Sequence, residues 1–151
     1  MTQATRDVAA QPRTSILKRD PSWQAFALLR TVFIIAPILF GLDKFFNLLV
    51  DWPIYLTPDV TGALAITDQQ FMYAVGVIEI VAGLVVLLAP RWGALLVAVW
   101  LLGIIINLIS LGGFYDVALR DFGLLVGALA LWRLSVTHAP GLAFGRGRSR
   151  D

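Results

Sequence analysis

Four long apolar stretches constrain this chain more than any other feature. They cover about residues 25–50, 69–89, 93–111 and 117–136. A helix needs about 20 residues to cross the apolar core of a bilayer, so each stretch is long enough. Strands that span a membrane alternate apolar and polar residues, whereas runs such as LLVAVWLLGIII do not. The sequence therefore predicts an all-α fold, an integral membrane bundle of four helices.

Composition agrees with this prediction and excludes several functions. Of the 151 residues, 58% are hydrophobic and 15% are charged, which leaves too few charges for the polar surface of a soluble domain. The absence of cysteine excludes thiol catalysis, disulfides and cysteine-ligated metals. His138 has no second metal ligand nearby, so no metal site is expected. No basic stripe indicates nucleic acid binding, and the expected surroundings are membrane lipids.

The distribution of basic residues predicts the orientation of the spans. Residues 1–22 form a basic segment, 23–137 the membrane domain and 138–151 a basic tail that we expect to be disordered. The connection at 51–68 has no Lys or Arg. Nine of the twelve basic residues fall on the opposite side: Arg6, Arg13, Lys18, Arg19, Arg91, Arg133, Arg146, Arg148 and Arg150. By the positive-inside rule, both termini are cytoplasmic and the number of spans is even.

The 51–68 connection is the one long loop, on the predicted outer side. Thr57-Pro58-Asp59 has the pattern of a helix start, with proline at the first helical position. We expect a short interfacial helix there, on or in the outer leaflet, acting as a plain lid or as a binding loop.

Apart from Arg133 at the inner end of the last span, six ionisable residues lie inside the predicted spans: Arg30, Asp43, Lys44, Glu79, Arg120 and Asp121. Each would cost about 2.5–3.5 kcal/mol facing lipid at the bilayer centre, so we expect them inside the bundle. Their depths along the helices predict a Lys44–Glu79 pair and place Arg120 near Asp43 or Asp121. Arg30 lies far from these residues and can extend toward the inner surface.

Asp43 and Lys44 are neighbours and point about 100° apart on a helix. We therefore expect each to contact a different helix. Stripes of small residues should let the helices approach closely, with Asn107 as a polar neighbour on one of them. The glycines of these stripes are Gly41, Gly76, Gly83, Gly103, Gly123 and Gly127.

Two interpretations of the polar cluster remain open. Its members (Asp43, Lys44, Glu79, Asn107, Arg120 and Asp121) can be interhelical clamps that fix the register of the helices. They can also line a polar pocket near the outer face, with Glu79 as a proton or ligand site.

Three segments resemble the DoxX-like family of small membrane proteins. They are GLDKF (41–45) together with Arg30, GVIEIVAGLVVLLAPR (76–91) and YDVALRDFGLLVGALAL (115–131), and the resemblance covers about residues 26–136. The resemblance implies a four-helix fold in the bacterial inner membrane. Some DoxX-like proteins are small subunits of thiosulfate:quinone oxidoreductases, and another joins superoxide dismutase to a sulfur transferase. The resemblance supplies no catalytic residues.

Three functions fit these observations. The first expectation is a non-catalytic membrane subunit or scaffold of a redox or stress-related complex, with a membrane or peripheral redox protein as partner. The alternative is a quinone-binding subunit, with quinone as the cofactor. A second alternative is a small-solute or proton-coupled carrier that works as a homo-oligomer.

Overall fold

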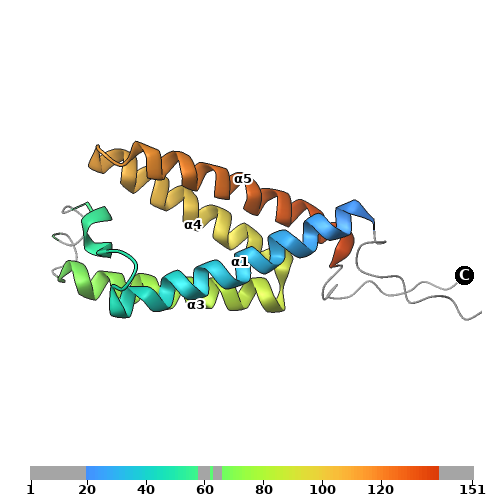
Figure 1. Cartoon of the computed structure of the whole chain (residues 1–151), viewed down its shortest axis with the longest axis horizontal. Coiled ribbons are helices and arrows are strands. Elements are labelled where there is room, and N and C mark those ends of the chain that lie inside the picture. The colour runs from blue at the N-terminus through green and yellow to red at the C-terminus, as the bar shows by residue number, and fades with distance from the viewer. Residues whose placement is uncertain (1–19, 58–61, 63–65, 140–151) are drawn as a thin grey trace, which may run out of the picture.

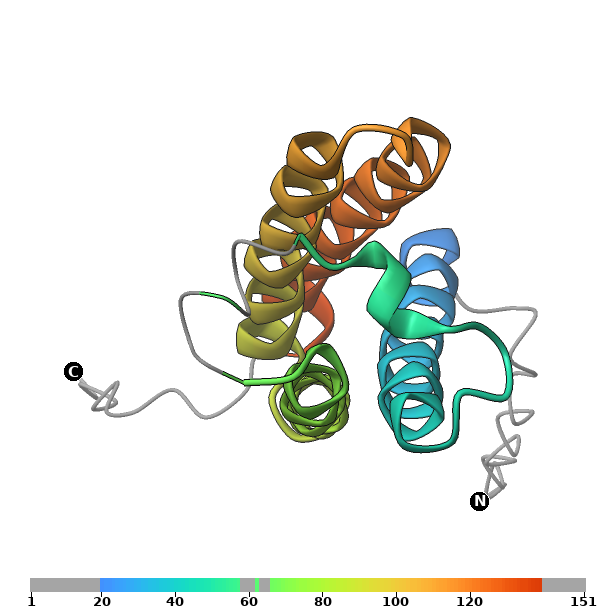
Figure 2. The same ribbon diagram turned by 90° about the vertical axis from the view of Figure 1, so that its left-hand side faces the viewer.

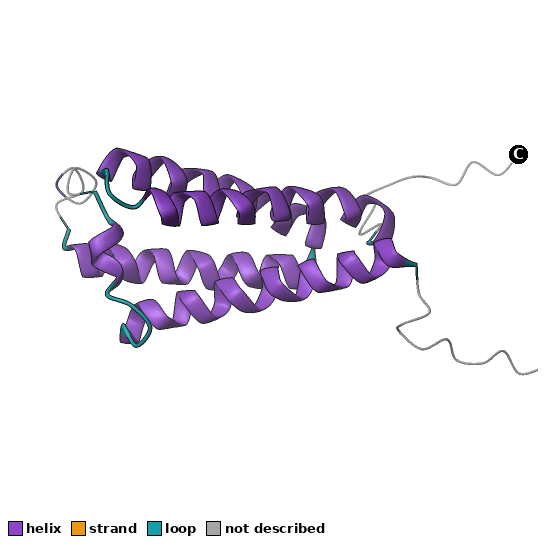
Figure 3. Cartoon of the chain, turned by 45° about the horizontal axis from the view of Figure 1, so that its top comes forward, coloured by secondary structure: helices purple, strands orange, loops and turns teal. Residues whose placement is uncertain are grey.

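Four long helices and one short helical turn make up the fold. The computed structural model describes residues 20–57, 62 and 66–139. The elements are α1 (Pro21–Phe46), the 3-10 helix η2 (Trp52–Tyr55), α3 (Asp68–Leu88), α4 (Pro90–Leu111) and α5 (Tyr115–His138). The helices run up and down the bundle, and the turns lie at its two ends (Figure 1; Figure 3). The predicted all-α bundle is confirmed.

Three of the described helices are long and apolar enough to cross a membrane. They are α1, α3 and α4, with 26, 21 and 22 residues. Large apolar side chains such as Leu28, Val99 and Leu119 are exposed on the bundle, as expected for a surface that faces lipid. The fourth helix, α5, has 24 residues but is more polar, because Arg120, Asp121 and Arg133 lie within it. These three helices are consistent with a helical membrane bundle, and the fourth crossing stays a prediction.

The helix boundaries differ from the predicted spans by up to four residues, and two of the differences have a clear local cause. The first span was predicted to reach residue 50, but α1 ends at Phe46, where Asn47 adopts a left-handed backbone with φ 49°. The third was predicted from residue 93, but α4 begins at Pro90, because proline suits the first helical position. A single residue, Ala89, separates α3 from α4.

The predicted interfacial helix that starts at Thr57-Pro58-Asp59 falls mostly outside the described residues, so it stays a prediction. Earlier in the same connection the structure has a separate short element, η2 (Trp52–Tyr55). Residues 58–61 and 63–65 lie outside the described residues. Most of the predicted segments 1–22 and 138–151 lie outside them as well, although α1 already begins at Pro21 and α5 extends to His138.

The helices pack as two pairs. α1 packs most extensively on α3, and α4 on α5, as the end-on view shows (Figure 2). We call the end that holds η2 and the α4–α5 turn the loop end, and the opposite end, where α1 begins and α5 ends, the termini end. The two pairs meet at the termini end and separate toward the loop end (Figure 1).

Glycines explain where the helices come close. A Cβ on Gly41 would lie 2.6 Å from the carbonyl oxygen of Gly76, and one on Gly76 equally close to that of Gly41. A Cβ on Gly83 would lie 2.7 Å from the side chain of Ile38. These three glycines pack as predicted, at the α1–α3 interface. At the termini end, a Cβ on Gly93 would lie 2.4 Å from the backbone nitrogen of Val86, so only glycine allows this α3–α4 approach.

The prediction for the remaining glycines was only partly right. Gly127 lies against Phe33 of α1, with 3.4 Å between an added Cβ and the ring. Gly103 and Gly123 were predicted to pack against other helices, and this is wrong, because nothing lies within 4 Å of a Cβ added to either. Small size alone marks where helices can approach and does not fix which faces meet.

An apolar core fills the termini-end half of the bundle. It contains ten buried residues: Phe26, Phe33, Ala82, Val86, Ala94, Val97, Ala98, Leu101, Ala128 and Leu131. Ser22 and His138 then join the first and last helices, with 2.8 Å between Oγ and Nε2. Apolar side chains therefore fill most of this half.

Arg30 has a more definite role than the predicted extension toward the inner surface. Its Nη2 donates to the carbonyl oxygen of Leu87 at 2.6 Å, and its guanidinium lies 5.9 Å from the ring of Phe26. Leu87 is in the last turn of α3, where carbonyls lack partners within the helix and a cation is favourable. Arg30 therefore caps α3 from α1.

Candidate polar site in a loop-end cavity

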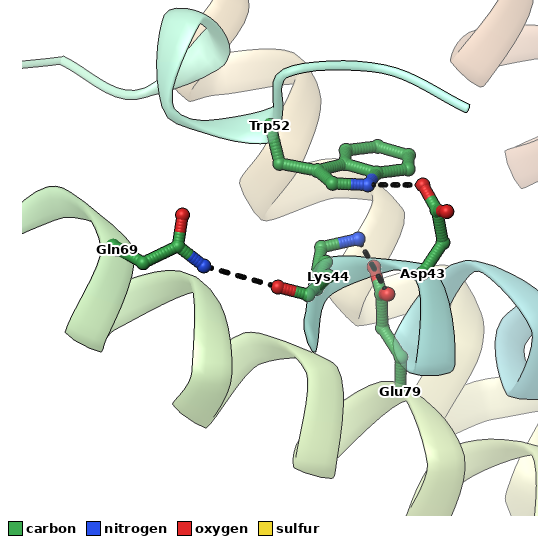
Figure 4. Close-up of polar contacts among 5 residues, drawn as sticks. All are labelled: Asp43, Lys44, Trp52, Gln69 and Glu79. Carbon is green, nitrogen blue, oxygen red and sulfur yellow. Dashed lines mark hydrogen bonds and ion pairs between the residues drawn. The ribbon is translucent and has the colours of Figure 1, made fainter. Parts of the chain in front are cut away.

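The predicted Lys44–Glu79 pair is confirmed. Lys44 Nζ donates to Glu79 Oε2 at 2.6 Å, and the two side chains are 4% and 11% exposed (Figure 4). Lys44 lies in the last turn of α1 and Glu79 in the middle of α3, on the same faces as Gly41 and Gly76. Because the two helices approach closely at these glycines, the side chains of Lys44 and Glu79 come within hydrogen-bond distance.

Asp43 does not contact a second long helix, so that expectation is wrong. Its Oδ1 accepts from the backbone N–H groups of Leu48 and Leu49 at 3.0 and 3.1 Å. Its Oδ2 accepts from the indole Nε1 of Trp52 at 2.7 Å. Asp43 thus stabilises the chain reversal that follows α1. Through Trp52 it also holds η2 against the end of α1. The prediction failed because it assumed that α1 continues to residue 50.

Trp52 joins the two acidic residues into one network. Lys44 Nζ lies 3.7 Å from the centroid of the Trp52 ring, a cation–π distance, while the indole N–H is bound to Asp43. Asp43, Trp52, Lys44 and Glu79 therefore form a continuous chain of contacts from η2 to α3 (Figure 4). Gln69 adds a second link between the helices by donating to the Lys44 carbonyl oxygen at 3.1 Å.

Asn107 attaches the other side of the connection. Its Nδ2 donates to the Tyr55 carbonyl oxygen at 2.6 Å, and its Oδ1 accepts from the Thr57 hydroxyl at 2.9 Å and from the Thr57 N–H at 3.3 Å. The segment 52–57 is therefore fixed to α1 at one end and to α4 at the other.

Arg120 and Asp121 lie on α5 across from this network. Arg120 Nε and Asp121 Oδ1 are 3.4 Å apart, so of the two predicted partners Arg120 meets Asp121. The Arg120 side chain is 68% exposed and that of Asp121 only 8%. Because the Arg120 guanidinium is mostly exposed and screened by its surroundings, this long contact contributes little to stability.

A cavity of about 660 Å³ lies between the two helix pairs in the loop-end half. Five of the six predicted cluster residues line it, namely Lys44, Glu79, Asn107, Arg120 and Asp121. Asp43 does not line it and acts through Trp52. The walls are otherwise mainly apolar and aromatic, with Phe40, Tyr55 and Trp100 among the lining residues. The volume is in the usual range for small-molecule sites.

A smaller cavity of about 80 Å³ adjoins the large one. Glu79 and Trp100 line both cavities, and Val32, Pro37 and Val97 line only the small one. The small cavity is therefore an apolar side chamber that shares Glu79 and Trp100 with the wall of the large cavity.

Trp52, Thr57 and Trp100 belong to the site but are missing from the predicted cluster. Trp52 and Thr57 come into contact with it only because the connection folds back over the cavity. For Trp100 a signal existed in the sequence, since a tryptophan in the middle of the apolar 93–111 stretch needs a partner for its indole N–H. The described residues contain no group of three or more potential metal ligands.

Comparisons with known proteins do not assign this chain to a family. No known protein family, curated protein sequence or solved structure matches the chain. The resemblance to DoxX-like proteins stays a prediction.

Proposed function

We propose that this chain is a membrane subunit whose loop-end cavity binds a small lipophilic molecule, with quinones as the first class to test. The observation that carries the proposal is the cavity of about 660 Å³ with the buried Lys44–Glu79 pair in its wall. The pair lies beside open space that a ligand can occupy.

The composition of the wall supports a ligand with a large apolar part. Aromatic and aliphatic side chains dominate it, and the charged lining residues are Lys44, Glu79, Arg120 and Asp121. Each of the two lining ion pairs, Lys44–Glu79 and Arg120–Asp121, joins one cation to one anion, so the charged groups of the wall are neutral as a set. A neutral molecule with an apolar body and a polar ring or head fits this arrangement better than an ion does.

The proposal includes the finer topology. Four spans in a bacterial inner membrane, with the loop end at the outer face and both termini cytoplasmic, satisfy the positive-inside rule. Arg91 lies in the first turn of α4 and Arg133 lies near the end of α5, so both belong to the termini end. The DoxX-like resemblance supports a redox-associated complex as the partner, in which this chain is the ligand-binding subunit.

A pair of glycine substitutions tests the cavity. Gly103 and Gly123 both have open space at Cβ, but only Gly103 lines the cavity. Protein immobilised in dodecyl maltoside is incubated with decylubiquinone, and the bound amount is measured by mass spectrometry against protein-free beads. We expect saturable binding to the wild type and to Gly123→Phe, and at least a tenfold loss in Gly103→Phe. Equal retention by all three proteins would contradict the proposal.

A further inference from the structure

The exposed side chains of the cavity wall gather on one side of the bundle. Those that line the large cavity are Phe40, Leu49, Arg120 and Leu124. Phe40 belongs to α1 and Leu49 to the segment that follows it, whereas Arg120 and Leu124 belong to α5. The lining residues of α3, in contrast, are buried or partly buried. The exposed part of the wall therefore lies where α1 and α5 face each other.

The segment 52–57 covers the loop end of the cavity. Besides its hydrogen bonds to α1 and α4, it contributes Leu56 to a buried apolar cluster that includes Met72 of α3. The ring of Tyr55 packs edge-on against Phe114, immediately before α5, with 4.9 Å between centroids. In the end-on view, η2 lies between the two helix pairs (Figure 2). The segment thus contacts three long helices and the start of the fourth, and it covers the cavity from this end.

Close packing covers the other sides. α1 meets α3 at Gly41 and Gly76, and α4 meets α5 through a buried apolar cluster that includes Ala118. Between α3 and α4, Phe71 and Trp100 pack against the buried cluster of Leu56. The apolar core fills the bundle toward the termini end. The side between α1 and α5 is therefore the one with exposed lining side chains and no such cover.

This open side continues toward the middle of α1. Phe40 and Leu124 line the side chamber as well as the large cavity. Val32 also lines the side chamber, lies near the middle of α1 and is 50% exposed. An apolar surface thus leads from the cavity wall toward the level where a bilayer is most apolar.

We infer that the ligand enters the cavity sideways from the lipid, between α1 and α5, and that it is an amphiphile with a long apolar tail. Its polar head lies beside Lys44 and Glu79, and its tail leaves between the two helices and runs along Val32. A tail that stays among lipid chains gives up no favourable surroundings when the head binds. The volume of the cavity therefore limits the head and not the tail. The inference rests on the proposed function, because it names the ligand class of the same cavity.

Ubiquinone-10 tests the opening, because its decaprenyl tail is too long to fit inside about 660 Å³. It is compared with decylubiquinone at equal mole fractions in dodecyl maltoside, in the immobilised-protein assay. The two quinones share the same head group, so we expect the wild type to bind them within about threefold of each other. Gly103→Phe should lose both. If decylubiquinone binds and ubiquinone-10 does not, the inference is overturned and the proposed function stands. If neither binds, both fail.

A photoreactive residue tests the side on which the tail leaves. With p-benzoylphenylalanine in place of Val32, irradiation should attach bound ubiquinone-10 to α1, and excess decylubiquinone should prevent this. The matched control carries the same residue in place of Val99, which is 63% exposed on α4, lies one turn from Gly103 and lines neither cavity. We expect no attachment there above the protein-free background. Attachment at Val99 and none at Val32 would place the exit between α3 and α4 and overturn the inference.

Discussion

The two ends of this bundle are built differently. In the termini-end half, apolar side chains fill the space between helices, and the buried polar residue there, Ser135, donates to the Leu131 carbonyl oxygen of its own helix. The buried charged residues of the described chain (Asp43, Lys44, Glu79 and Asp121) lie between the loop end and the middle of the bundle. The packing of apolar side chains holds the termini-end half together, whereas a polar network around a cavity holds the loop-end half together.

The difference follows from how α3 and α4 are joined. A single residue links them, and Gly93 lets their backbones meet, so the two helix pairs are held together at the termini end. At the loop end the corresponding join is the longer connection that contains η2, held by Asp43 and Asn107. Tight packing at one end leaves room at the other, and polar contacts then hold the open end in place.

The largest expected effect is the loss of a charge from the loop-end network. Lys44→Met leaves Glu79 buried without its partner and should lower the free energy of unfolding by about 3–5 kcal/mol. Thermal unfolding in dodecyl maltoside, followed by circular dichroism, measures this. The double variant Lys44→Met/Glu79→Gln should recover most of the loss, because no lone charge remains. If the double variant were as unstable as the sum of both single variants, the pair would not act as a unit.

Large-to-small substitutions sharpen the contrast between the two halves. Leu131 in the termini-end core is 0% exposed, and Leu131→Ala should destabilise the protein by about 2–5 kcal/mol through the void that it creates. Leu124 lines the loop-end cavity and is 37% exposed, so Leu124→Ala enlarges a space that already exists and should cost clearly less. The same unfolding assay compares the two variants, and equal losses would mean that the two halves are equally packed.

The smallest effect concerns two glycines of one helix. Gly93→Ala places a methyl group against the α3 backbone and should cost about 1–3 kcal/mol. Gly103→Ala meets open space and gains helix propensity, so its stability should be unchanged or higher by up to about 1 kcal/mol. Unfolding midpoints of the two variants check this prediction. A destabilisation by Gly103→Ala would show that the space beside Gly103 is already filled and would contradict the open cavity.

The sequence by itself determined the fold class and one central contact. Long apolar stretches need their backbone hydrogen bonds satisfied internally, which leaves helices as the spanning structure. Within those helices, Lys44 and Glu79 share faces with Gly41, Gly76 and Gly83, and opposite charges at similar depth have few other partners. The capping box of Thr67 and Gln70 at the start of α3 is equally local, and the structure contains it.

Only the tertiary structure decided what surrounds that contact. The role of Asp43 depends on where α1 ends, and α1 ends at Phe46 because the chain reverses there and the carboxylate binds the reversed segment. The contacts of Trp52 and Asn107 depend on the path of the connection. The cavity, with Trp100 at its side chamber, depends on the angle between two helix pairs. Apolar helices pack in many ways with similar energy, so no pattern along the chain fixes that angle.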